Sequence, residues 1–242
     1  MLNIVKSETR EAMGAAAAAQ VAAWLREVLS GQPTANVIFA AAPSQNDFLA
    51  ALTTDGSIDW PRINGFHMDE YVGLASAAPQ LFGNFLKGKL FDKAAFRSVF
   101  YIDSQALDPG AECARYAALL RSHPPDLVCM GIGENAHIAF NDPPVADFRD
   151  PAWVKIVSLD DVCRQQQVND GCFARLDDVP EMAITLTIPA LVQARFISCV
   201  VPGIRKRRAV ADTLHAPISE NVPSTILRTH PDAILFVDND SI

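Results

Sequence analysis

The stretch Leu127-Val-Cys-Met-Gly-Ile-Gly-Glu-Asn-Ala-His-Ile-Ala-Phe-Asn-Asp-Pro-Pro144 is the most informative part of this chain for its fold class. Its first four residues are apolar, as expected for a buried strand, and Gly131 and Gly133 then end that strand in a turn. A histidine, two amides and two carboxylates crowd the positions that follow. Ligands of parallel α/β sheets bind outside the carboxyl ends of the strands, so this composition favours a chemical role for the loop.

Short apolar segments alternate with helical patterns along the rest of the chain. Strands are expected at residues 36–40, 63–68, 98–102, 126–130, 154–159, 182–188, 196–201 and 233–237. Helices are expected at residues 8–29, 44–52, 80–90 and 109–120, with Ser44 as an N-cap and a basic helix after Gly203. This alternation predicts one domain over residues 1–242, an open, mostly parallel sheet of Rossmann-like type with helices on both faces.

The composition excludes several classes of partner. The chain has 242 residues and a formal charge of −8, which argues against nonspecific binding to nucleic acid or to an anionic membrane. Its five cysteines are odd in number and lack metal-ligand spacing, so we expect reduced thiols and no metal. The N-terminus lacks the pattern of a signal peptide, and we expect a cytoplasmic protein. The sequence leaves open whether the chain forms a homo-oligomer.

Two residues stand out as candidates for acid–base chemistry. Asp69 follows an expected strand and precedes a second carboxylate, Glu70. An aspartate at such a position commonly caps a turn, but it can also serve as a general base. His137 has an unperturbed pKa near neutrality and can pass protons in either direction. His67 lies two residues before Asp69, and the sequence allows either a functional role or a packing role for it. A lone histidine is more often a packing residue.

Two boxes of sequence resemble the glucosamine-6-phosphate deaminase (isomerase) family, which is related to the 6-phosphogluconolactonases. The family pattern M-D-E-Y-V-G-L is matched without a change from Met68 to Leu74. The pattern G-x-G-x-D-G-H-I-A-F-N-E-P is matched from Gly131 to Pro143, except at three positions. These positions carry Asn135 for the aspartate, Ala136 for the glycine and Asp142 for the glutamate.

The resemblance implies an aldose–ketose isomerase coupled to deamination. In the family, the aspartate matched by Asp69 moves a proton between C1 and C2 of the open-chain sugar. The histidine matched by His137 opens the pyranose ring, and flanking carboxylates orient and tune it. Asp142 retains one of these carboxylates, whereas Asn135 can orient the ring by hydrogen bonding but brings no charge. Glu134, one position earlier, is a candidate to supply that charge. No metal or organic cofactor is implied.

The resemblance also implies residues that hold a sugar phosphate. The family places a loop rich in Gly and Thr after its first strand, where this chain has Ser44 and Gln45 and no glycine. Free amides at a helix N-terminus can still bind an anion there, although a plain helix cap is an equal alternative. Lys206, in the segment after Gly203, aligns with the family's phosphate-binding lysine. Arg164 lies in the region of the family's mobile lid and its phosphate-binding arginine.

The sequence is therefore compatible with three functions. The leading one is conversion of glucosamine 6-phosphate, or a close amino-sugar phosphate, to fructose 6-phosphate and ammonia. The alternatives are a sugar-phosphate lactonase resembling 6-phosphogluconolactonase, and a noncatalytic sugar-phosphate-binding protein. The sequence Met-Asp-Glu-Tyr-Val-Gly sides with the deaminases.

Overall fold

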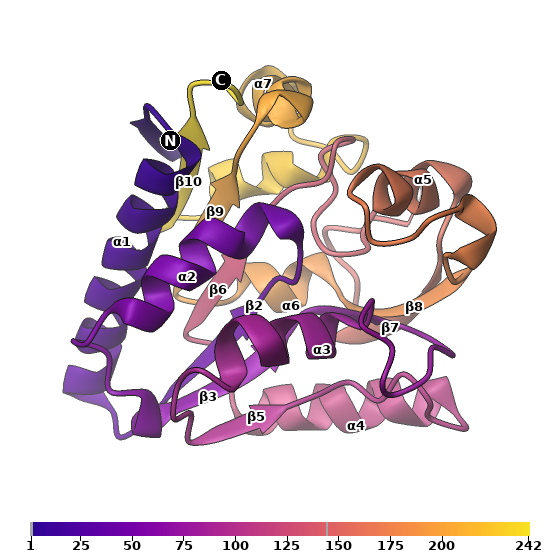
Figure 1. Cartoon of the computed structure of the whole chain (residues 1–242), viewed down its shortest axis with the longest axis horizontal. Coiled ribbons are helices and arrows are strands. Elements are labelled where there is room, and N and C mark those ends of the chain that lie inside the picture. The colour runs from indigo at the N-terminus through magenta and orange to yellow at the C-terminus, as the bar shows by residue number, and fades with distance from the viewer. Residues whose placement is uncertain (1, 144) are drawn as a thin grey trace.

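A seven-stranded parallel sheet forms the centre of the protein (Figure 1). The computed structural model describes residues 2–143 and 145–242. The strand order is β1-β10-β9-β6-β2-β3-β5, and every neighbouring pair is parallel. The strands are β1 (Asn3–Ser7), β2 (Ala35–Phe39), β3 (Ile63–His67), β5 (Ser98–Phe100), β6 (Leu127–Met130), β9 (Phe196–Val201) and β10 (Ala233–Asp238). The predicted single-domain, mostly parallel α/β fold is confirmed.

A second sheet of three antiparallel strands stands beside the first. It has the order β4-β8-β7 and consists of β4 (Asp69–Tyr71), β7 (Val154–Ser158) and β8 (Met182–Leu186). The sequence patterns identified β7 and β8 as strands but placed them with the parallel set. Apolar alternation reports that a strand is half buried, and it carries no information about which neighbour the strand pairs with.

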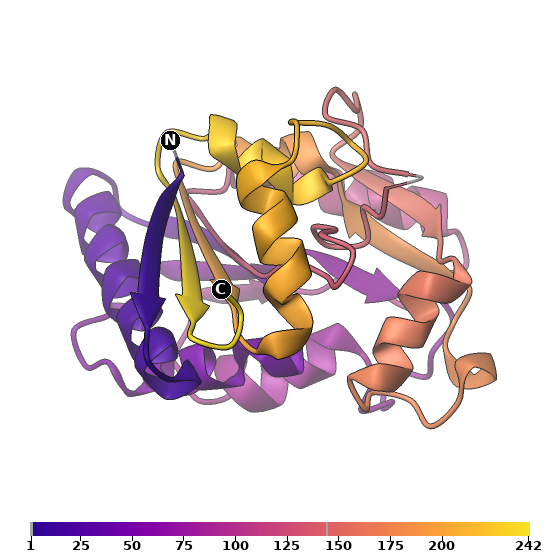
Figure 2. The same cartoon turned by 90° about the horizontal axis from the view of Figure 1, so that it is seen from above.

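Helices cover both faces of the large sheet (Figures 1 and 2). They are α1 (Arg10–Gly31), α2 (Asn46–Thr54), α3 (Phe82–Leu86), α4 (Pro109–Ser122), α5 (Asp161–Asn169), α6 (Ile188–Val192) and α7 (Arg207–His215). Short 3₁₀ turns, among them Pro43–Gln45 and Ile204–Lys206, precede α2 and α7. The sequence patterns had not predicted β1, α5 or α6.

The residues of β2 show how the two apolar cores divide. Val37 and Phe39 pack in the core that includes buried residues of α1, α2 and α3. Ile38 points to the other face and packs in the core that includes buried residues of α4, α6 and α7. This period of two follows from the pleat of a strand with both faces covered. Burial of each such side chain stabilises the fold by about 1.5–3 kcal/mol.

Four adjacent strands of the large sheet bring the candidate residues together. The strands β9, β6, β2 and β3 are neighbours and parallel, so their carboxyl ends lie at one edge. The segments that follow them carry Lys206, His137, Ser44 and Asp69, respectively. Among the described residues, no helix combines the length and the apolar character that crossing a membrane requires.

Candidate active site

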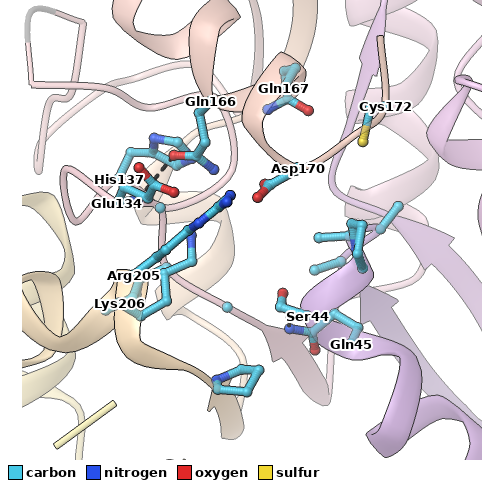
Figure 3. Close-up of a pocket in the computed structure, with 18 of the residues that line it drawn as sticks. Ser44, Gln45, Glu134, His137, Gln166, Gln167, Asp170, Cys172, Arg205 and Lys206 are labelled. Carbon is cyan, nitrogen blue, oxygen red and sulfur yellow. Dashed lines mark hydrogen bonds between the residues drawn. The ribbon is translucent and has the colours of Figure 1, made fainter. Parts of the chain in front are cut away.

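A cavity of about 380 Å³ opens at the carboxyl edge of the large sheet. Asp69, His137, Ser44, Gln45 and Lys206 all line it, so five of the eight residues singled out from the sequence share one cavity. Figure 3 shows His137 and Glu134 on one side, Ser44 and Gln45 on another, and Arg205 and Lys206 between them.

Asp69 is the first residue of β4 and is held there by its backbone. Asp69 pairs with Thr185 of β8, and the preceding carbonyl of Met68 accepts a hydrogen bond from Leu186 N at 2.8 Å. The side chain is buried, at 7% exposure, yet it lines the cavity. Burial, with the neighbouring Glu70 carboxylate second, raises the pKa of Asp69 well above its ordinary value. A carboxylate with a raised pKa is a stronger base for a carbon-bound proton.

Glu70 points away from Asp69 and fixes the loop that follows. Its carboxylate accepts hydrogen bonds from the backbone N–H groups of Tyr71, Phe82 and Gly83 at 2.9–3.0 Å. It thereby ties β4 to the N-terminus of α3. Burial raises the pKa of Glu70 to about 7 in spite of these hydrogen bonds, which lower it.

His137 is supported from behind by a carboxylate. Its Nδ1 lies 2.9 Å from Asp142 Oδ1, and Asn135 Nδ2 donates to the same oxygen at 2.8 Å. Burial raises the pKa of Asp142, but the charge of His137 and hydrogen bonds from His137, Asn135 and Cys163 outweigh it and keep that pKa below its ordinary value. An ionised Asp142 accepts only, so Nδ1 carries the proton and Nε2 is the nitrogen left for a ligand.

Asn135 forms hydrogen bonds both to the backbone of its own loop and to the carboxylate of the His137–Asp142 pair. Its Oδ1 accepts a hydrogen bond from the backbone N–H of His137 at 3.1 Å. The amide therefore contacts Asp142 and the His137 backbone, and it reaches the imidazole only through Asp142. Neither Asn135 nor Asp142 belongs to the described residues that line the cavity; both stand behind His137.

Glycine is required at position 133 by the imidazole. A Cβ at Gly133 would lie 2.3 Å from the Cε1 of His137, which no side chain tolerates. Ala136, where the family pattern has glycine, adopts a left-handed backbone with φ of 66°. That conformation strains an alanine but leaves His137 lying over Gly133.

Lys206 brings a buried positive charge to the cavity. Gly203, with φ of 90°, turns the chain after β9, and its N–H donates to both carboxylate oxygens of Asp238 at 3.0 Å. Lys206 then ends the 3₁₀ turn with 9% exposure. Burial lowers the pKa of Lys206, although the charges of Asp170 and Glu134 act in the other direction. No described residue accepts a hydrogen bond from its ammonium or forms an ion pair with it, so the cavity presents a buried cation that an anionic ligand would stabilise.

Ser44 does not cap α2 as the sequence suggested. The residue before α2 is Gln45, and neither the 3₁₀ turn nor α2 has a side-chain cap. A proline at residue 43 starts the 3₁₀ turn, and the N-cap of α2 lies one residue later than expected. The Ser44 hydroxyl instead accepts a hydrogen bond from Gln45 Nε2 at 3.2 Å, which also donates to Val200 O. Both side chains line the cavity.

Arg10 was missed from the sequence and also lines the cavity. It is the first residue of α1, its Nε donates to Asp47 Oδ2 at 2.6 Å, and its Nη2 donates to Pro43 O at 3.1 Å. Arg10 therefore anchors the loop that carries Ser44. The signal that could have found it is the edge strand β1, which ends three residues earlier at the same edge of the sheet.

The end of α5 closes the cavity with polar side chains that the sequence did not single out. Gln166, Gln167 and Asp170 line it, and Gln166 Oε1 accepts from the backbone N–H of Glu134 at 2.9 Å. Figure 3 shows Arg205 and Lys206 extending toward the Asp170 carboxylate. Arg205 also donates to Asn169 O at 2.8 Å, which joins α5 to the segment before α7.

Arg164 lies outside the cavity. Its guanidinium donates to the carbonyls of Leu176 and Val179 and pairs with Asp161, and it is outside the set of described residues that line the cavity. The structure therefore does not bring Arg164 together with the other candidate residues.

Glu134 lines the cavity beside His137. Its Oε1 is buried and has no hydrogen-bond partner among the described residues, so Asp142 is the carboxylate that contacts the imidazole. Within residues 2–143 and 145–242, no three His, Cys, Asp or Glu side chains gather in a way that could hold a metal ion.

A parallel α/β sheet whose carboxyl edge joins a basic carboxylate, a histidine–carboxylate pair and an unpaired lysine defines an acid–base site for a small anionic ligand. The chain belongs to the glucosamine-6-phosphate isomerases/6-phosphogluconolactonase family, whose sequence profile matches residues 8–235.

Named relatives and solved structures agree with this assignment. The chain is 33% identical over 206 residues to the glucosamine-6-phosphate deaminase of Listeria welshimeri, covering 85% of this chain and 86% of the relative. It is 37% identical over 182 residues to that of an Exiguobacterium species, covering 75% and 70%. The structure of a monomeric glucosamine-6-phosphate deaminase superposes with a TM-score of 0.90 at 27% identity over 99% of this chain and 98% of that one. The 6-phosphogluconolactonase of Thermotoga maritima shares the fold, with a TM-score of 0.80 at 18% identity over 99% and 100%.

Proposed function

We propose that this protein converts glucosamine 6-phosphate, or a close amino-sugar phosphate, to fructose 6-phosphate and ammonia. The observation that carries the proposal is the presence of Asp69, His137 and the unpaired Lys206 ammonium around one cavity. Named deaminases at 33–37% identity support the same reaction.

Ring opening is the first step and falls to His137. The pyranose opens when the C1 hydroxyl loses its proton and the ring oxygen gains one, which leaves an aldehyde at C1. Nε2 of His137 is an acceptor in the tautomer that Asp142 selects, so it can take the hydroxyl proton and return it to the ring oxygen. Asp142 stabilises the imidazolium that exists between the two transfers.

Asp69 then moves a proton between neighbouring carbons. It removes the proton from C2 and leaves an enolamine, and protonation of C1 converts that enolamine to an iminium at C2. Addition of water to the iminium gives the ketone of fructose 6-phosphate and releases ammonia. The raised pKa of Asp69 suits both halves of this step, because a stronger base is needed first and a carboxylic acid second. The substrate's own carbonyl and amine carry the electrons, so the reaction as proposed uses no cofactor.

The phosphate is proposed to lie between Lys206 and the loop of Ser44 and Gln45. An anion there would pair with the buried ammonium and accept from the Ser44 hydroxyl. Arg10 and Arg205 line the same cavity and add positive charge. A cytoplasmic location stays a prediction.

Product analysis tests the proposal against its alternatives. The purified protein is incubated with glucosamine 6-phosphate and, separately, with 6-phosphogluconolactone. We expect equal amounts of ammonia and fructose 6-phosphate from the first and little acceleration of lactone hydrolysis. Fast hydrolysis of the lactone alone would assign a lactonase. Binding of a hexose phosphate without any product would assign a noncatalytic binding protein.

A further inference from the structure

The chain changes sheets at Asp69, the proposed base. The strand β3 of the large sheet ends at His67, and β4 of the small sheet begins at Asp69, so only Met68 separates the two sheets. The orientation of Asp69 therefore depends on how this junction is held.

The imidazole of His67 bridges the junction. Its Nδ1 lies 2.9 Å from the backbone carbonyl of Asp69, and the backbone N–H of Ile102 donates to its Nε2 at 2.9 Å. A carbonyl only accepts and an N–H only donates, so the proton must sit on Nδ1. His67 is fully buried, and burial lowers its pKa to about 4, which keeps this neutral tautomer in place at cellular pH.

The peptide of His67 is fixed as firmly as its ring. The hydroxyl of Tyr116, from α4, accepts from His67 N at 3.1 Å and lies 2.9 Å from His67 O. Tyr116 is itself fully buried. His67 is thus anchored by a helix on one face of the large sheet and by the segment that follows β5.

The carboxylate of Asp69 has no comparable anchor of its own. Among the described residues, no donor forms a hydrogen bond or an ion pair with its side-chain oxygens. Its direction is therefore set by its backbone, which is held by the pairing with β8 on one side and by the bond from His67 on the other.

We propose that His67 is a positioning residue that aims the Asp69 carboxylate at the substrate through the Asp69 peptide. The inference rests on the proposed function in that Asp69 is the base. A misplacement of about 1 Å can cost on the order of 10²-fold in rate, so loss of this one bond should lower kcat.

Two substitutions separate this role from a plain packing role. In His67→Asn the amide nitrogen takes the place of Nδ1 and can still donate to Asp69 O, but the Ile102 N–H loses its acceptor. In His67→Gln the amide oxygen takes the place of Nε2 and can still accept from Ile102 N, but the bond to Asp69 is lost. Each variant keeps one bond and loses one, so similar losses of stability are expected.

The measurement is kcat and KM for glucosamine 6-phosphate, together with the thermal midpoint of each variant. We expect kcat of His67→Gln to fall at least about tenfold below that of His67→Asn, with KM values within about twofold of each other. Equal kcat values, or a lower kcat for His67→Asn, would overturn the inference while leaving the proposed function intact. A wild-type protein without turnover would overturn the proposed function instead, and crystal structures of the two variants would then decide whether only His67→Gln displaces Asp69.

Tyr116→Phe provides a second test if either variant fails to fold. It keeps the ring of His67 and nearly fills the same volume, but it removes the hydroxyl that is hydrogen-bonded to the His67 peptide. We expect kcat to fall about threefold to tenfold with KM unchanged. An unchanged kcat in a folded Tyr116→Phe would contradict the inference.

Discussion

Asn135 and His137 share one acceptor: Nδ2 of Asn135 and Nδ1 of His137 lie 2.8 and 2.9 Å from the same oxygen, Oδ1 of Asp142. The amide therefore stands where the family pattern has a carboxylate, and it donates where that carboxylate could not. Two changes from the family pattern therefore meet beside His137: Asn135 replaces the aspartate, and Asp142 is one methylene shorter than the glutamate it replaces.

Asn135→Asp is expected to lower activity, even though it restores the family residue. It would place a second carboxylate against Asp142, and the repulsion would raise the pKa of one of them. At pH 7 we expect kcat to fall about tenfold, and the double variant with Asp142→Glu to recover part of that loss. A higher kcat for the single variant would show that Asn135 is a handicap and would contradict this account of the pair.

Activity is expected to fall on the acid side at a higher pH than an ordinary aspartate would give. Asp69 must be ionised to remove the C2 proton, and its raised pKa means that protonation begins earlier as the pH is lowered. Glu70→Gln removes the neighbouring charge and should move the acid limb of kcat/KM to lower pH by about one unit. Glu112→Gln is the control, because Glu112 is also buried but pairs with Arg115 on α4. An acid limb at the ordinary carboxylate value would contradict the assignment.

Lys206→Met should raise stability and weaken binding at the same time. The buried ammonium has no partner among the described residues, so an apolar side chain of similar length should stabilise the unliganded protein by about 1 kcal/mol. Loss of the charged contact should raise KM by about 10- to 100-fold. Urea unfolding and steady-state kinetics measure the two effects. Arg208→Met, on the exposed face of α7, should change neither, and an unchanged KM for Lys206→Met would exclude the lysine from phosphate binding.

Ala136→Gly should stabilise the protein. The left-handed backbone at Ala136 costs an alanine about 1 kcal/mol that a glycine does not pay. We expect the free energy of unfolding to rise by about that amount. Ala211→Gly, on the exposed face of α7, should do the opposite because glycine weakens a helix. A drop in stability for Ala136→Gly would mean that the loop is not strained there.

The sequence located the core of the site because of a general property of parallel sheets. Asp69, His137 and Lys206 each follow an apolar strand, and parallel neighbours end at one edge. Arg10 escaped notice because β1 is a short strand at the edge of the sheet, with a weak apolar pattern of exposed and half-buried residues. Without that strand, residue 10 could not be placed at the same edge.

The position of Arg164 outside the cavity could not be predicted for a similar reason. The sequence indicated that cavity residues would come from this region, but the direction of each side chain depends on the helix α5, which the pattern did not reveal. Gln166 and Asp170 are four residues apart and face the cavity together, whereas Arg164 turns toward Leu176 and Val179. The small sheet could not be predicted for a different reason: the antiparallel pairing of β4 with β8 joins residues more than a hundred positions apart.

Release of ammonia from glucosamine 6-phosphate by the wild-type protein and by Asp69→Asn, measured side by side, tests the central claim most directly. Asparagine keeps the shape of the side chain and removes the base, so we expect turnover by the wild type and a loss of about 10³-fold or more in the variant, with both proteins equally folded. Turnover that survives in Asp69→Asn would contradict the assignment of Asp69 as the group that carries the proton between C1 and C2.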